Sequence, residues 1–171
     1  MKSKTKKLTV ASMTCALSVV LMLLGSIFEV MDLSCAAICS ALIAFSILEL
    51  GGAYPVLVYC ATTLLGILLL PNKLPALYYA LFFGWYPIAK LPLERLRGAV
   101  SLILKLMLCA ISLTAILLAS TLFAPAEELI CMSIPVYVLC LAVFLIYDVA
   151  LSRITVAYLV RYRHKIKLWR K

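Results

Sequence analysis

Four charged residues lie within or at the ends of long apolar runs of this chain: Glu49, Lys105, Asp148 and Arg153. Ionisable side chains in such runs are costly, so they pair with one another or line a path for protons or substrate. Pairing of Lys105 with Glu49 or Asp148 is the structural interpretation of this charge network. A relay, or coupling to a cytoplasmic partner, is the functional one.

Residues typical of catalysis or metal binding are sparse. The one histidine, His164, lies in a basic segment, without a carboxylate cluster or a nucleophile elbow. Gly51 and Gly52 lack the lysine and spacing of a phosphate-binding loop. Cys35 and Cys39 share a helix face, but nothing completes a set of metal ligands. The sequence therefore predicts no enzyme, cofactor or metal site.

The composition indicates a membrane protein. Of the 171 residues, 66% are hydrophobic, against roughly 45–50% in soluble domains. The apolar residues form continuous blocks without period-two alternation, which favours helices over a barrel. We therefore expect an all-α integral membrane protein with 1–171 as a single transmembrane domain.

Six transmembrane helices are expected, because a span needs roughly 20 apolar residues. Gly51, Gly52 and Pro55 mark one break, and charged residues or prolines mark the others. The first run has a basic start but is too long for a cleavable signal. The predicted helices cover about 8–28, 33–50, 54–71, 74–91, 99–124 and 130–152, followed by a basic tail at 153–171.

The basic residues predict the orientation. Fourteen of the 16 lysines and arginines fall before the first helix, between the fourth and fifth (Lys90, Arg95, Arg97), or after Asp148. The positive-inside rule therefore puts both termini in the cytoplasm. The net charge of +9 follows from this topology and from contact with anionic lipid, so a nucleic-acid partner is not expected.

Three further groups of side chains suggest contacts. A small-residue face on the first helix either packs within the bundle or docks a partner protein; it comprises Ala11, Ser12, Cys15 and Ala16. The aromatic run at 82–87 beside Lys90 is typical of an interfacial belt. Residues at the external ends of the helices either line a small-molecule pocket or are solvated loop tips; they are Glu29, Asp32, Asn72, Lys73, Tyr78, Tyr79 and Tyr137.

With its size, six predicted helices and small-residue face at Ala11, Ser12, Cys15 and Ala16, the chain resembles the substrate-binding S components of energy-coupling factor (ECF) transporters. The stretch from Phe28 to Arg97 more closely resembles uncharacterised S-component-like membrane proteins of Gram-positive bacteria. The resemblance implies a plasma-membrane subunit that binds a vitamin or micronutrient-like solute near the outer face. It also implies docking of the first helix on a coupling membrane protein driven by two cytoplasmic ATPases.

Two alternatives remain open. The rod-shape accessory protein of cell-wall synthesis shares this fold, so the chain is also similar to a non-transporting scaffold that binds partner membrane proteins. A small proton-coupled carrier would need Glu49 or Asp148 on a water path. A ligand pocket would distinguish the transporter subunit from the scaffold.

Overall fold

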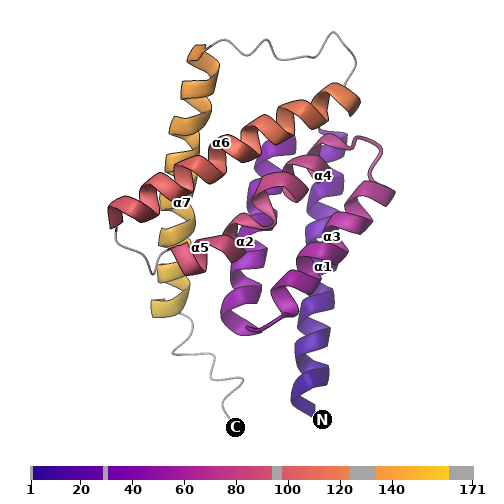
Figure 1. Ribbon diagram of the computed structural model, residues 1–171. Helices are drawn as coiled ribbons and strands as arrows, with labels where there is room; N and C mark the ends of the chain where they lie inside the picture. Colours follow the sequence, from indigo (N-terminus) through magenta and orange to yellow (C-terminus); the bar gives the residue numbers. More distant parts are fainter. Residues whose placement is uncertain (1, 29–30, 94–97, 124–133, 162–171) are drawn as a thin grey trace.

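The computed structural model describes residues 2–28, 31–93, 98–123 and 134–161, and within these ranges the chain is helical apart from short turns (Figure 1). The predicted all-helical class is therefore confirmed for the described residues. The described helices are α1 (Lys2–Ile27), α2 (Asp32–Glu49), α3 (Tyr54–Leu69), α4 (Leu74–Tyr78), the π-helix η2 (Tyr79–Phe83), α5 (Tyr86–Leu93), α6 (Gly98–Phe123) and α7 (Ile134–Arg161).

The fourth predicted helix is a composite, because α4, η2 and α5 follow one another along 74–93. Counting them as one gives six helical segments among the described residues. The last helix runs to Arg161, well past residue 152. Residues 130–133 and 162–171, from the predicted sixth helix and basic tail, lie outside the described residues.

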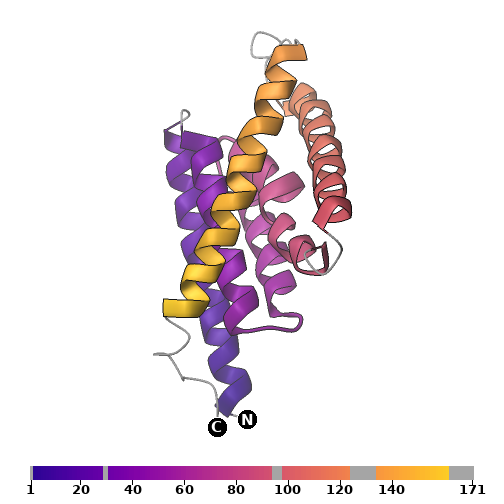
Figure 2. The same cartoon turned by 90° about the vertical axis from the view of Figure 1, so that its left-hand side faces the viewer.

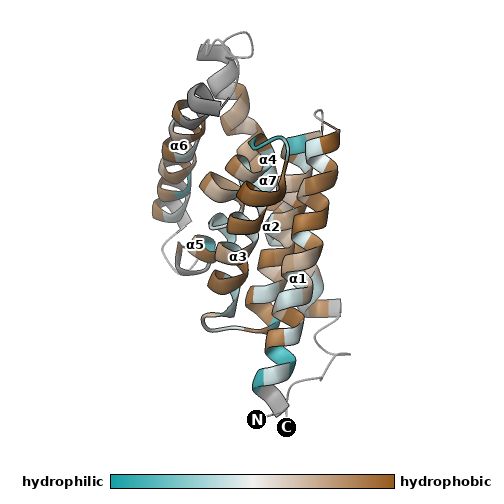
Figure 3. Ribbon diagram, turned by 90° about the vertical axis from the view of Figure 1, so that its right-hand side faces the viewer, coloured by the Kyte–Doolittle hydropathy of each residue, from teal (hydrophilic) through white to brown (hydrophobic). Residues whose placement is uncertain are grey.

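Three described helices are long and apolar enough to cross a membrane, over Lys4–Ile27, Asp32–Glu49 and Leu139–Tyr158. Tyr54–Leu69 and Ile103–Ile116 are shorter apolar helices. Large apolar side chains are exposed on the described helices, among them Met13, Leu68 and Ile146. Hydrophobic residues predominate along the helix ribbons (Figure 3). A soluble protein rarely exposes so many large apolar side chains. The chain is a multi-pass membrane protein.

Small side chains hold α1 against α2 and α3. The buried face of α1 carries Ala11, Cys15, Ser18 and Gly25, spaced at helical intervals. The Thr62 hydroxyl of α3 donates to Cys15 Sγ at 3.3 Å, and the Cys39 thiol of α2 donates to the Ser18 carbonyl oxygen at 3.3 Å. Small residues let helix backbones approach closely, and close packing is what associates helices in lipid.

The two ends of the bundle differ in charge. The start of α1 and the end of α7 lie at the same end (Figure 1), which we call the basic end because it carries Lys6 and Lys7. There the Lys7 ammonium donates to the Leu50 carbonyl oxygen at 2.9 Å, beside the turn at Gly51 and Gly52. Both glycines have positive φ, which costs glycine little.

The other end, which we call the opposite end, is closed by Asn72 in the turn between α3 and α4. Its side-chain amide donates to Asp32 Oδ2 at 3.2 Å, and its backbone N–H donates to Ser26 Oγ at 3.0 Å. These two bonds join the turn to the start of α2 and the end of α1.

Two backbone carbonyl groups of the π-helix η2 accept hydrogen bonds from side chains. The Tyr59 hydroxyl donates to the Ala80 carbonyl oxygen at 2.8 Å, and Trp85 Nε1 donates to that of Leu81 at 2.7 Å. The Gly84 N–H closes the wide turn on the Tyr79 carbonyl oxygen at 2.7 Å. Single π turns inside helices are frequent at functional sites, and this one contains Phe82 and Phe83.

Replacing Gly84 by alanine should destabilise the fold by ~2 kcal/mol, because a Cβ there forces its neighbours to shift and overpacking is costly. That Cβ would lie 2.5 Å from Tyr59 Cδ2 and 2.9 Å from the Tyr79 carbonyl oxygen. Thermal unfolding of the purified protein in detergent measures the loss. The cost should shrink in a Tyr59→Ala background; an equal cost in both backgrounds would contradict this contact.

Candidate functional site

A polar cluster around Asp148, which we call the Asp148 cluster, joins α5, α6 and α7. Lys90 Nζ lies 2.5 Å from Asp148 Oδ1, and Lys105 Nζ lies 2.9 Å from Oδ2. The Tyr86 hydroxyl also donates to Oδ1, at 2.5 Å, and Lys90 Nζ donates to Ser152 Oγ at 2.6 Å. The side chains of both lysines and the aspartate are only 7–13% exposed. One carboxylate therefore binds three helices together.

The structure divides the charge network predicted from the sequence. Lys105 contacts Asp148, one of the two acids expected for it. Glu49 lies elsewhere and accepts a hydrogen bond from the Tyr158 hydroxyl at 2.5 Å, which ties α2 to α7 near the basic end. Arg153 is exposed on α7. Only Lys105 and Asp148 of the four therefore belong to one described site.

Lys90 lies in a different environment from the one that the sequence analysis predicts for it. The sequence assigned it to a cytoplasmic connection, but it lies in α5 and is 6% exposed. Pro87 suggested an interruption. It stands in the first turn of α5, where its missing N–H costs no helical bond and the helix continues. The sequence did contain a signal for the position of Lys90, since this residue lies four residues after Tyr86 and so shares its helix face.

The four residues predicted to dock a partner lie on two sides of α1. Ala11 and Cys15 are buried inside the bundle, whereas Ser12 and Ala16 are exposed. Ala11 and Cys15 already pack within this chain, so only Ser12 and Ala16 of the four are accessible on the outside of the bundle. Docking through Ser12 and Ala16 stays a prediction.

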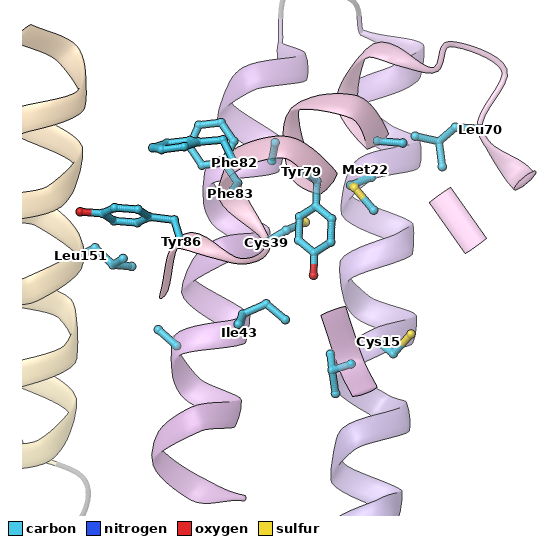
Figure 4. Close-up of a cluster of buried hydrophobic side chains, with 14 of the residues drawn as sticks. Cys15, Met22, Cys39, Ile43, Leu70, Tyr79, Phe82, Phe83, Tyr86 and Leu151 are labelled. Atoms are coloured by element: carbon cyan, nitrogen blue, oxygen red, sulfur yellow. The ribbon is translucent and has the colours of Figure 1, made fainter. Parts of the chain in front are cut away.

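Several of the residues expected to form an external solute pocket make contacts within the chain. Asp32 and Asn72 bind each other. Lys73 Nζ donates to the carbonyl oxygens of Ile67 and Leu70, at the end of α3. Tyr78 is half-buried, and Tyr79 is fully buried between α1 and α2 (Figure 4). Glu29 and the side chain of Tyr137 lie outside the described residues.

A cavity of about 390 Å³ lies instead between α2, η2, α6 and α7. From one side, α2 and η2 supply Leu33, Ser34, Ala37, Phe82 and Phe83. From the other, α6 supplies Cys109, Leu113 and Ile116, and α7 supplies five residues between Leu139 and Tyr147. Its size lies within the range of roughly 300–1,000 Å³ for ligand pockets, and its lining is almost entirely apolar. None of Asp32, Asn72, Lys73, Tyr78 and Tyr79 lines it.

Aromatic rings form the floor of the cavity. Phe82 stacks on Tyr86 with centroids 5.2 Å apart, and it meets Phe144 edge-on at 5.6 Å. Phe83 meets Tyr147 edge-on at 5.2 Å. These rings are not the interfacial belt that the run at 82–87 predicted, because Phe82, Phe83 and Tyr86 are buried. The π turn places them on the inward side of the composite helix.

The floor touches the Asp148 cluster directly. Tyr86 points toward α7 (Figure 4), and its ring contacts Phe82 while its hydroxyl reaches Asp148. Tyr147, the neighbour of Asp148 on α7, lines the cavity and donates from its hydroxyl to Ser40 Oγ of α2 at 2.5 Å. A molecule in the cavity would rest on rings held by these polar bonds.

Comparison of the chain with protein-family models, with curated proteins and with solved structures gives no match.

Replacing Asp148 by asparagine should destabilise the protein by about 3 kcal/mol, because breaking a buried ion pair leaves charge without its counterion. Unfolding in a denaturing detergent titration measures the change. Arg153→Gln, on the exposed side of the same helix, is the matched control and should stay within about 0.5 kcal/mol of the wild type. Equal stability of D148N and the wild type would refute the structural role of the cluster.

Proposed function

We propose that this chain is the substrate-binding membrane subunit of an ECF-type uptake transporter, with six spans and both termini in the cytoplasm. The observation that carries the proposal is the cavity of about 390 Å³ between α2, η2, α6 and α7, which aromatic rings close at one end. A scaffold that only binds other proteins has no need for a ligand-sized cavity inside its own bundle. The bound solute would be small, with an apolar body that matches the lining.

The charge distribution supports the orientation. Lysines gather where α1 starts, and α7 ends at the same end of the bundle (Figure 2). The positive-inside rule assigns such an end to the cytoplasm. The cavity is lined by Leu33 and Ala37 from the first turns of α2, which starts at the opposite end. It is therefore in the half of the bundle that would face the outside of the cell, where uptake begins.

The exposed side of α1 supports a docking role. Ser12 and Ala16 lie four residues apart among exposed apolar side chains such as Met13 and Leu17. A small pair within an apolar stripe lets a second helix approach closely. The partner would be the coupling membrane protein, with its two ATPases bound on the cytoplasmic side.

Affinity capture of the tagged full-length chain from native membranes in mild detergent tests this proposal. Mass spectrometry should identify a coupling membrane protein together with two ATPases. Ala16→Trp should abolish their recovery, because the indole prevents close helix approach, whereas Ile146→Trp on the exposed side of α7 should not. Ala11→Trp is unsuitable, because Ala11 is buried and the change would disturb the bundle.

Recovery of cell-wall enzymes in place of the ATPases, or of the chain alone, would contradict the proposal and favour the non-transporting scaffold. Equal recovery of the ATPases with A16W and the wild type would contradict docking through this side of α1.

A further inference from the structure

The cavity opens through an apolar rim on the outside of the bundle. Leu33 on α2 and Leu139 and Val143 on α7 line it and are 51%, 63% and 49% exposed. Both helices contain candidate membrane spans. Deeper lining residues are closed off, with Phe144 and Cys109 only 4% and 2% exposed. The path from rim to floor therefore starts on side chains that face hydrocarbon in a membrane.

The lining offers little to orient a strongly polar molecule. Pockets for water-soluble ligands carry a few convergent polar groups in an apolar wall. Ser34 and Tyr147 supply the hydroxyl groups of this lining. Ser34 is exposed at the rim, and the Tyr147 hydroxyl already donates to Ser40. Asp32, Asn72 and Lys73, which suit a polar solute better, are bonded elsewhere.

We infer that the cavity takes the hydrocarbon part of a membrane-soluble molecule, a chain or an apolar ring, which arrives sideways from the bilayer between α2 and α7. This inference rests on the proposed binding function and names its ligand class. Burial of apolar surface supplies the affinity, because it grows with the apolar area removed from water. The aromatic floor limits how far the hydrocarbon penetrates.

Photolabelling in lipid nanodiscs tests the inference on the full-length chain. The probe is palmitic acid with a diazirine in its chain, and mass spectrometry maps the modified residues. Labelling should concentrate on the deep lining residues Phe82 and Phe144, above that of the lipid-facing residues Met13 and Leu17 on α1. Labelling of the deep residues no stronger than that of α1 would overturn the inference.

Two variants make the result specific. Ala37→Trp fills the cavity from α2, and Val143→Trp blocks its rim, where a large side chain meets open space. Each should lower labelling of the deep residues about tenfold, equivalent to 1.4 kcal/mol. Ile146→Trp, on the exposed side of α7, should leave it unchanged. Undiminished labelling in both cavity variants would overturn the inference even if one of them folds poorly.

A phospholipid carrying the diazirine in its acyl chain identifies the source of the hydrocarbon. Deep labelling by palmitic acid alone supports a free membrane-soluble ligand, and deep labelling by both probes supports a chain of the bilayer's own lipids. Affinity capture of A37W separates this inference from the proposed function. Ala37 lies away from the exposed side of α1, so A37W should still recover the coupling protein and the ATPases although its deep residues are no longer labelled by the probe.

Discussion

A carboxylate far from water is stable only when cations and hydrogen-bond donors surround it. Asp148 meets this requirement with groups from three helices, because Lys90 and Tyr86 come from α5 and Lys105 from α6. That single side chain therefore links α5, α6 and α7 to one another. The geometry of the Asp148 cluster is also fixed, since both carboxylate oxygens accept hydrogen bonds, at 2.5–2.9 Å.

Two parts of this bundle are packed in different ways, and the cavity lies between these two parts. Small residues such as Ala11, Ser18 and Gly25 seat α1 tightly on α2 and α3. The helices α6 and α7 are instead held by directional polar bonds near the middle of α7, at Tyr147 and Asp148. Bulky rings from η2 fill the floor beside those bonds, and the space above them remains open. The same contacts that fix α7 therefore give the cavity its closed end.

The sequence predicted the helices well, because apolar runs and glycine or proline breaks are local signals. Gly51 and Gly52 end α2 as expected, since both adopt positive φ. It predicted poorly which side of each helix faces inward. In a membrane bundle both the lipid-facing and the buried sides are apolar, so the usual amphipathic pattern that separates them is weak. Ala11 and Ala16 look alike in the sequence, yet one is buried and the other exposed.

The candidate site was harder to predict for a related reason. A π turn changes the direction in which every side chain after it points. No local residue pattern predicted the π turn at Tyr79–Phe83. The rings of Phe82 and Tyr86 therefore face the bundle and not its surface. Lys105 and Asp148 were recognisable because charge in a long apolar run is rare. Lys90 was not, because two nearby prolines resembled the end of a helix.

The central claim is that this membrane protein holds a small molecule in the cavity above its aromatic floor. Native mass spectrometry of the full-length chain, released from its own membranes, tests that claim most directly. The account predicts that the wild type carries the added mass of one small molecule and that the cavity-filled variant A37W does not. A bare protein mass for both, or the same added mass on both, would contradict it.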